Sequence, residues 1–333
     1  MQTKSVMLQT LCVPCACRCR YCLLSWDGRI IGAEYGRSQR FAERFYVELK
    51  QVRPELSFHF SFGYSMEHPR LLDAIDFMNR IGSVSGKLLQ CDGMAFRTAE
   101  ELNDLLTGLH DHGVEALNFT FYGTEAYHDR FAGRQGDHAH LMSMMESAVR
   151  LGFRVSAGVP LTKENIDQVD RLLPEIEAHG GKGVRLFVPH GEGRGASLES
   201  IRLEWDDLSR IGATARDKLD ERIYQTEAQW CKMEGGEPER SRMLLLSLTE
   251  ETLDRLEQMS VDQIITSVEA LDDAYYEAYP TFRELLARYG DGEGRRLYSR
   301  RDLFHRLRRQ YAKEHGIQVY DVTDERQTGS RRY

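Results

Sequence analysis

Most of the cysteines of this chain are gathered in one short stretch near the N-terminus. The gathered residues are Cys12, Cys15, Cys17, Cys19 and Cys22, while Cys91 and Cys231 stand alone. A disulfide framework spreads its cysteines to join distant loops and belongs in an oxidising compartment. Closely spaced cysteines in a reduced protein are more often metal ligands or redox groups. The cluster therefore predicts a metal-binding loop, and the rest of the fold has to present that loop.

Three of these cysteines, Cys15, Cys19 and Cys22, have the spacing C-x3-C-x2-C. Thiolate-bound iron–sulfur clusters usually take four cysteines, so three leave one iron open for a substrate or cofactor. Zinc is the alternative, because five local cysteines can supply a tetrahedral thiolate site. Zinc sites, however, usually pair two half-sites across a gap, and no second half-site follows. Cys12 and Cys17 do not fit the spacing and are interpreted as bystanders.

Short apolar runs alternate with amphipathic stretches from residue 4 to about residue 195. The pattern predicts strands at 5–10, 56–62, 86–91, 116–122, 153–159 and 183–188, and helices at 71–81, 100–112, 139–151 and 166–177. Alternating strands and helices imply parallel strands with right-handed crossovers. We therefore predict an α/β fold in which residues 1–195 form a partial (β/α)6 barrel of the TIM type. The chemistry of such barrels gathers at the C-terminal ends of the strands, and the cysteine cluster directly follows the first strand.

Beyond residue 195 the pattern becomes mainly helical, so residues 196–333 are predicted to form a helical C-terminal domain that covers the open face of the barrel. The predicted helices are 204–224, 249–259, 261–271, 272–289 and 299–315, with a strand signal at 317–322. Pro280 is expected to break or kink the fourth of these helices.

Charge and hydropathy argue against two kinds of partner. The formal net charge of −8 and a pI near 5.8 disfavour nucleic acid. No apolar run is long enough for a transmembrane helix, and the N-terminus lacks the features of a signal peptide. We therefore expect a cytoplasmic protein without a membrane partner.

The cysteine spacing, the preceding Pro14, the aromatic Tyr21 and the position after the first strand resemble the radical S-adenosylmethionine (radical SAM) superfamily. The resemblance covers roughly residues 4–195. It implies a [4Fe-4S] cluster held by Cys15, Cys19 and Cys22, with S-adenosylmethionine on the open iron. It also implies an enzyme that takes an electron from a flavodoxin- or ferredoxin-type donor. S-adenosylmethionine is then cleaved to methionine and a 5′-deoxyadenosyl radical, which abstracts a hydrogen atom from the substrate.

The second signature of the family is a Gly-Gly-Glu-Pro run that meets the methionine amine, and this chain departs from it. Alignment on His68-Pro69 selects Phe62, Gly63 and Tyr64 for the contact, whereas alignment on the acid selects Glu67.

Two later segments resemble the family as well. The segment after the fourth strand implies that Thr120 contacts the cofactor carboxylate and that Arg130 supports the same charge, since guanidinium pairs well with carboxylate. The glycine-rich loop after the sixth strand places His190 near the adenine or the substrate.

The resemblance implies a small-molecule, natural-product-type substrate and epimerisation, rearrangement, elimination or bond formation. A peptide-modifying maturase acting on a short peptide is the alternative, and an iron–sulfur or zinc-binding regulator is the non-enzymatic rival. Because Cys231 is the only cysteine after Cys91, no auxiliary-cluster (SPASM or twitch) extension is expected. Cys91, at the end of the third strand, and Cys231, in the cap, are candidate hydrogen-atom donors, with burial in a core as the other interpretation.

Overall fold

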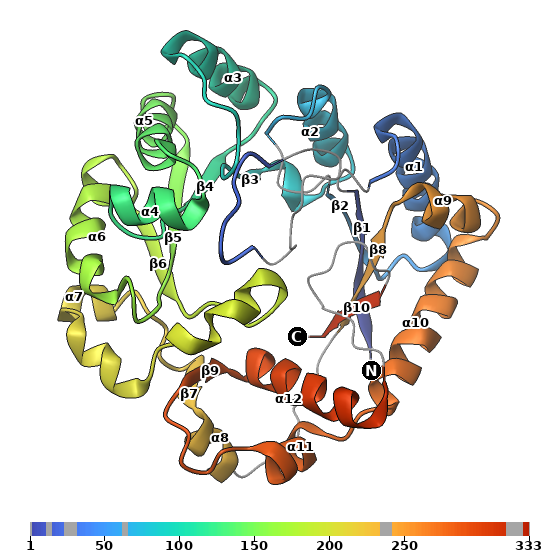
Figure 1. Ribbon diagram of the computed structural model, residues 1–333. Coiled ribbons are helices and arrows are strands. Elements are labelled where there is room, and N and C mark those ends of the chain that lie inside the picture. The colour runs from blue at the N-terminus through green and yellow to red at the C-terminus, as the bar shows by residue number, and fades with distance from the viewer. Residues whose placement is uncertain are drawn as a thin grey trace.

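The computed structural model describes residues 2–10, 15–22, 32–61, 66–233, 242–317 and 329–332. In this part of the chain, parallel strands lie at the centre and helices surround them, which Figure 1 shows end-on. Among the described residues, no helix combines the length and the apolar character needed to cross a bilayer.

Eight of the described strands form two four-stranded sheets that together make the wall of a partial barrel, and β7 (Tyr224–Thr226) and β9 (Leu297–Ser299) form a separate antiparallel pair. The first sheet has the order β10 (Gly329–Arg332), β8 (Arg242–Ser247), β1 (Thr3–Gln9) and β2 (Ser57–Ser61). The second has the order β3 (Leu88–Gln90), β4 (Ala116–Thr120), β5 (Arg154–Pro160) and β6 (Gly183–Phe187). All neighbours are parallel except β10, which runs antiparallel to β8. The six predicted strands are thus all present, and the predicted α/β fold class is confirmed.

A buried serine adjoins the edge of the first sheet. The Ser83 hydroxyl lies 3.3 Å from both the backbone nitrogen and the backbone oxygen of Phe60 on β2. Ser83 directly precedes η1 (Val84–Gly86), the short 3-10 turn that leads into β3. This contact holds the segment that leads from α2 to β3 against the end of β2, so that the two sheets are joined at this point.

One parallel strand was not predicted. β8 lies beside β1 in the sheet, although its residues belong to the region predicted to be a helical domain. Every residue of β8 is buried, and its central residues, Met243–Leu246, form a continuous apolar run without the alternation that marks a half-exposed strand. The sheet therefore does not stop at residue 195, and the expected boundary there does not separate the barrel strands from the C-terminal region.

Helices between the strands cover the outer face of the sheets. They are α1 (Tyr35–Val52), α2 (Leu71–Arg80), α3 (Ala99–Asp111), α4 (Glu125–Ala132), α5 (Asp137–Arg150) and α6 (Val169–Ala178), the last preceded by η2 (Ile166–Gln168). Their apolar stripes pack on alternate strand residues, such as Val6 and Leu8 of β1, to make the main core. The predicted helices of this half are confirmed.

The C-terminal region differs more from prediction. It contains η3 (Gly193–Ile201), η4 (Trp205–Arg210), α7 (Ala213–Arg216), β7 (Tyr224–Thr226), α8 (Glu227–Lys232), α9 (Glu250–Leu256), α10 (Val261–Glu277), α11 (Phe282–Tyr289), β9 (Leu297–Ser299) and α12 (Arg300–His315). The long helix predicted over 204–224 is wrong, because extended backbone at Ile211 and Gly212 separates two short turns. The two helices predicted at 261–271 and 272–289 do not separate after residue 271. Instead, α10 continues to Glu277 and ends before Pro280. The strand signal at 317–322 falls almost wholly outside the described residues.

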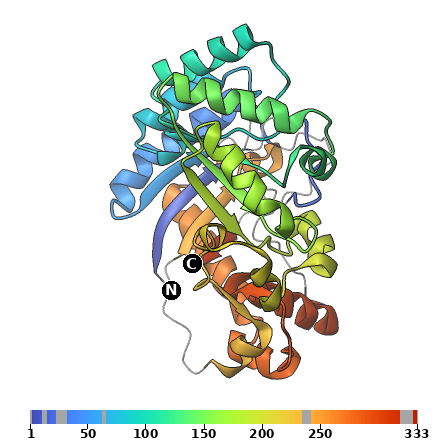
Figure 2. The same cartoon turned by 90° about the vertical axis from the view of Figure 1, so that its left-hand side faces the viewer.

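A second, smaller core joins α8, α11 and α12. Trp230, Phe282 and Tyr298 are buried in it, and the Trp230 indole donates to the Tyr298 carbonyl at 3.0 Å. Figure 2 shows most of the orange and red C-terminal helices at one end of the molecule, below the green and blue helices of the barrel. The C-terminal region thus contributes both a barrel strand and a helical group beside the barrel.

Candidate functional site

The described part of the cysteine loop, residues 15–22, lies across loops that follow three different barrel strands. Backbone hydrogen bonds hold it to the β3–α3 loop, the end of α4 and the start of η3. The bonds are Ala16 N–H to Gly93 O (2.7 Å), Arg18 N–H to Ala132 O (2.7 Å), Arg20 N–H to Phe131 O (3.1 Å) and Arg194 N–H to Cys22 O (3.0 Å). The loop therefore lies at the C-terminal ends of the strands, as predicted.

The cysteines of this loop differ in burial. Cys15, Cys19 and Cys22 are half-buried, whereas Cys17 is buried. The Cys17 thiol donates to Asp137 Oδ2 at 3.6 Å, and the same oxygen accepts from His128 Nε2 at 3.1 Å. Cys17 is thus engaged with the protein, and the three cysteines of the predicted motif keep partial access to solvent.

Glycine is required beneath the loop. A Cβ built on Gly93 would lie 2.0 Å from Cys15 Sγ, and the φ of Gly93 is +71°. A hydrogen bond to Cys17, together with burial, raises the pKa of the Cys15 thiol well above its usual range. The thiol is therefore protonated, and binding to a metal would release this proton.

Three half-buried thiols, of which Cys15 lies against Gly93, are the donor set of a cluster with one open iron. Across residues 15–22 and the rest of the described chain, no three His, Cys, Asp or Glu side chains are grouped so as to hold a single metal ion.

We expect Gly93→Ala to lose iron after anaerobic reconstitution, because the new methyl group displaces the Cys15 thiol. Gly82→Ala is the matched control, since Gly82 has the same φ of +71° and nothing within 4 Å of its Cβ position. Both variants bear the left-handed backbone strain of about 1 kcal/mol. Iron content per protein separates them, and equal iron in both would show that Gly93 does not shape the loop.

Asp92 is a site residue that was not predicted. Its carboxylate accepts from the Thr120 N–H at 2.8 Å, from the Thr120 hydroxyl at 2.7 Å and from the Gln90 amide. Burial raises the pKa of Asp92 to about 6, although the hydrogen bonds from Thr120 oppose the shift. Asp92 directly precedes Gly93, and its charge contributes to the raised pKa of the Cys15 thiol. The signal that could have revealed it is its position directly after the third strand.

The contacts described for Glu67 are with the β3–α3 loop and not with the cysteine loop. Its carboxylate forms a two-pronged ion pair with Arg97, at 2.7 and 2.9 Å, and accepts the Ala95 N–H at 2.8 Å. Burial opposes ionisation of Glu67, but these hydrogen bonds outweigh it and lower its pKa. Glu67 therefore anchors the β3–α3 loop. The other residues selected for the amine, Phe62, Gly63 and Tyr64, lie outside the described residues.

Glu67→Gln should lower the free energy of unfolding by about 1–2 kcal/mol at pH 7, because a charged pair becomes a neutral contact. A lowered folded pKa means that this stabilisation is present above pH 4.5, the ordinary value, and is lost as the pH falls further. The difference from wild type should therefore shrink in acid. Urea denaturation at several pH values measures it, with Asp73→Asn, from the exposed Arg70–Asp73 pair, as control. A difference independent of pH would refute the ionic role.

The remaining predicted cofactor residues fall in different places. Thr120 lies at the mouth of the barrel, where the strands have their C-terminal ends, and its hydroxyl donates to Asp92. Arg130 is exposed on α4, with its guanidinium 5.1 Å from the centre of the Tyr127 ring, and no described contact joins it to the cysteines. His190 is half-buried in the 190–195 loop, whose Arg194 N–H reaches Cys22.

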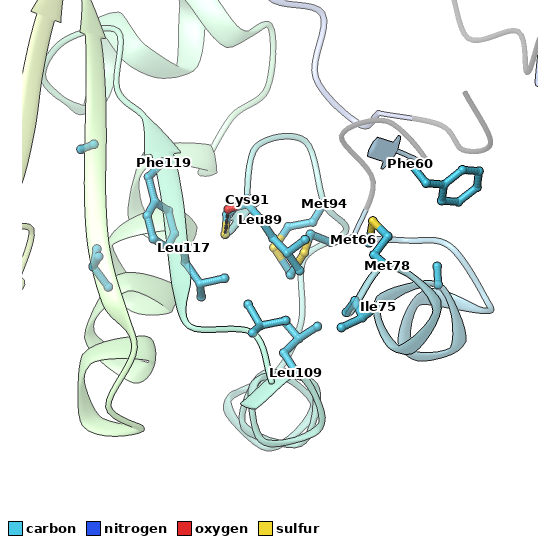
Figure 3. Packing of buried hydrophobic residues seen from close by; sticks show 14 of the residues in the cluster. Phe60, Met66, Ile75, Met78, Leu89, Cys91, Met94, Leu109, Leu117 and Phe119 are labelled. Carbon is cyan, nitrogen blue, oxygen red and sulfur yellow. Dashed lines mark hydrogen bonds between the residues drawn. The ribbon is translucent and has the colours of Figure 1, made fainter. Parts of the chain in front are cut away.

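The two isolated cysteines, the candidate hydrogen-atom donors, differ in burial. Cys91 is fully buried in the main core with Leu117 and Phe119 (Figure 3), and burial raises its pKa. Strand alternation puts it on the face opposite Gln90, so its height in the barrel does not bring it to the mouth. Cys231 is exposed on α8, and its thiol lies against Gly290 at the end of α11.

Neither a protein-family model nor a curated protein matches this sequence. Solved structures do resemble its fold. Coproporphyrinogen III oxidase (HemN) from Escherichia coli, described as a radical SAM enzyme, has 14% identity and a TM-score of 0.39, over 64% of this chain and 48% of its own. SuiB from Streptococcus suis, bound to S-adenosylmethionine, has 12% identity and a TM-score of 0.44, over 62% and 46%. Native anSMEcpe, with bound AdoMet and the Cp18Cys peptide, has 14% identity and a TM-score of 0.41, over 62% and 57%.

This chain therefore spans about half the length of the structures that it matches. Its fold is similar to that of these structures, and its cysteine spacing resembles that of the radical SAM superfamily.

Proposed function

We propose that this chain is a radical SAM enzyme in which Cys15, Cys19 and Cys22 hold a [4Fe-4S] cluster. The observation that carries the proposal is the loop with three half-buried thiols at the C-terminal ends of the parallel strands, where Cys15 lies against Gly93. When bound, the cluster and S-adenosylmethionine supply, with one added electron, methionine and a 5′-deoxyadenosyl radical that takes a hydrogen atom from the substrate to become 5′-deoxyadenosine.

Asp92 is proposed as the acid that meets the methionine amine. Glu67 is engaged by Arg97, whereas the Asp92 carboxylate lies at the mouth, next to the glycine that contacts Cys15. Three hydrogen bonds from Thr120 and Gln90 fix its orientation, and a carboxylate can accept about four. Thr120 is then a positioning residue for Asp92.

The substrate proposed first is a small molecule of the natural-product type, and a short peptide is the second candidate. The structures of SuiB and anSMEcpe contain the precursor peptide SuiA and the Cp18Cys peptide, respectively. A short peptide is therefore kept as the second candidate substrate. The electron donor is proposed to be a flavodoxin or ferredoxin.

The test is anaerobic reconstitution with iron and sulfide, followed by dithionite and S-adenosylmethionine. The proposal predicts about four iron atoms per chain, the visible absorption of an iron–sulfur cluster, and formation of 5′-deoxyadenosine by chromatography. A protein that takes up one zinc ion instead, and forms no 5′-deoxyadenosine, would support the regulatory alternative.

A further inference from the structure

Tyr122 is a buried tyrosine at the mouth of the barrel, two residues beyond the end of β4, and it is only 6% exposed. It belongs to a small hydrophobic cluster, separate from the main core, that also contains Cys17 and Phe131. The half-buried Cys15 and Cys19 pack against this cluster. The cysteine loop and the tyrosine therefore share one packed group of side chains.

The Tyr122 hydroxyl forms a side-chain hydrogen bond with the thiol of Cys19. The hydroxyl of a buried tyrosine usually finds a hydrogen-bond partner, and here that partner is a sulfur atom. A phenol keeps its proton near pH 7 and can donate it, whereas a thiolate can only accept. Once Cys19 loses its proton to bind a metal, the Tyr122 O–H is therefore the donor of a charge-assisted hydrogen bond to the sulfur.

Contacts outside the cysteine loop fix the position of Tyr122. Its backbone N–H donates to His128 Nδ1 at 3.2 Å, and its carbonyl accepts from the Asn165 amide at 2.7 Å. Its ring stacks on the ring of Phe131, with the two centroids 4.5 Å apart. The phenol is therefore held by α4 and by the residue before η2, and its position does not depend on the group that the thiols bind.

A hydrogen bond to a ligand sulfur changes the chemistry of an iron–sulfur cluster. Such bonds are among the features that set the reduction potential of the cluster. Reduction adds negative charge, so an O–H directed at a thiolate sulfur stabilises the reduced form more than the oxidised form. Loss of the bond therefore lowers the potential and makes the cluster harder to reduce.

We infer that Tyr122 is a positioning residue whose hydroxyl donates to the Cys19 thiolate and raises the reduction potential of the cluster. This inference rests on the proposed function, in which Cys19 is a ligand of the cluster. It adds to that function a residue that adjusts how readily the one electron is accepted from the donor. Tyr122 acts through Cys19 and is not itself a catalytic residue.

The test is Tyr122→Phe, which removes the hydroxyl and keeps the ring that stacks on Phe131. Wild type and variant are reconstituted anaerobically with iron and sulfide, and the midpoint potential is measured by redox titration followed by electron paramagnetic resonance, without S-adenosylmethionine. At the wild-type midpoint, we expect the ratio of reduced to oxidised cluster to fall about fivefold or more in the variant. A tenfold fall corresponds to about 59 mV for a one-electron couple. Iron content should match that of wild type.

Tyr127→Phe is the matched control. Tyr127 belongs to the same cluster of side chains as Tyr122, but its hydroxyl donates to Glu164 Oε2 at 3.0 Å. The potential of this variant should equal that of wild type. An unchanged potential in Tyr122→Phe, or an equal fall in both variants, would overturn the inference. Loss of iron in Tyr122→Phe alone would assign the hydroxyl to assembly of the loop and would overturn it as well.

A second measurement detects the hydrogen bond itself. In D₂O the Tyr122 hydroxyl carries an exchangeable deuteron beside the Cys19 sulfur. Electron–nuclear double resonance of the reduced cluster should record its coupling in wild type and Tyr127→Phe and not in Tyr122→Phe. The same coupling in all of these proteins would count against the inference. Iron content and formation of 5′-deoxyadenosine by the wild type test the proposed function separately, because both can be normal while Tyr122→Phe leaves the potential unchanged.

Discussion

Cys19→Ala should lose its cluster and all formation of 5′-deoxyadenosine, and Cys15→Ala and Cys22→Ala should do the same. In the proposed site three thiolates hold one cluster, and two cannot hold it while leaving one iron open. Iron and sulfide content, visible absorption and chromatography of the reaction mixture measure the effect. Full iron loading of the Cys19 variant would contradict the ligand assignment.

Cys17→Ala is the matched control, from the same loop and with the same atoms removed. Its thiol is buried against Asp137, so its loss should reduce stability by about 1–2 kcal/mol through packing and one hydrogen bond. Iron content should remain near that of wild type. If only the Cys17 variant lost iron, the ligand set would have to be redrawn around this residue.

Asp302→Ala should lower the free energy of unfolding by about 3 kcal/mol, the largest stability change that we expect. Asp302 on α12 pairs with Arg202 at 2.8 Å, and both side chains are almost fully buried. Removing one partner leaves a buried charge that Glu199 compensates only in part. Urea denaturation measures the loss. Asp167→Ala is the control, because its pair with Arg210 is exposed and should be worth under about 1 kcal/mol. Equal losses in the two variants would contradict the buried-pair argument.

The same variant should loosen the loop at residues 190–195. Asp302 Oδ1 accepts the Gly191 N–H at 2.8 Å, and Arg309 donates to the Gly191 carbonyl. Limited proteolysis should therefore cut this loop faster in Asp302→Ala than in Asp167→Ala. Asp302→Ala tests the C-terminal region better than a deletion of all residues after 195 does, because the deletion also removes β8 from the sheet.

Local pattern was enough for the barrel strands β1 to β6 and for four of the helices between them, α2, α3, α5 and α6, whereas α1 and α4 were not predicted. Each half-exposed strand alternates apolar and polar residues and each helix has an apolar stripe, and both patterns are properties of neighbouring residues. The place of the cysteine loop followed from the same reasoning, because parallel strands put their C-terminal ends at one side. β8 was missed because a strand buried on both faces has no alternation to detect.

The sequence by itself determined the parallel α/β class and the three-cysteine loop after the first strand, since both depend on spacing along the chain. Only the tertiary structure decided how distant side chains share partners. It pairs Glu67 with Arg97, joins Asp92 to Thr120 at the mouth, and turns Cys91 into the core. Those outcomes depend on which loops meet and on which face of a strand is turned inward, and neither is set by the residues immediately around each position.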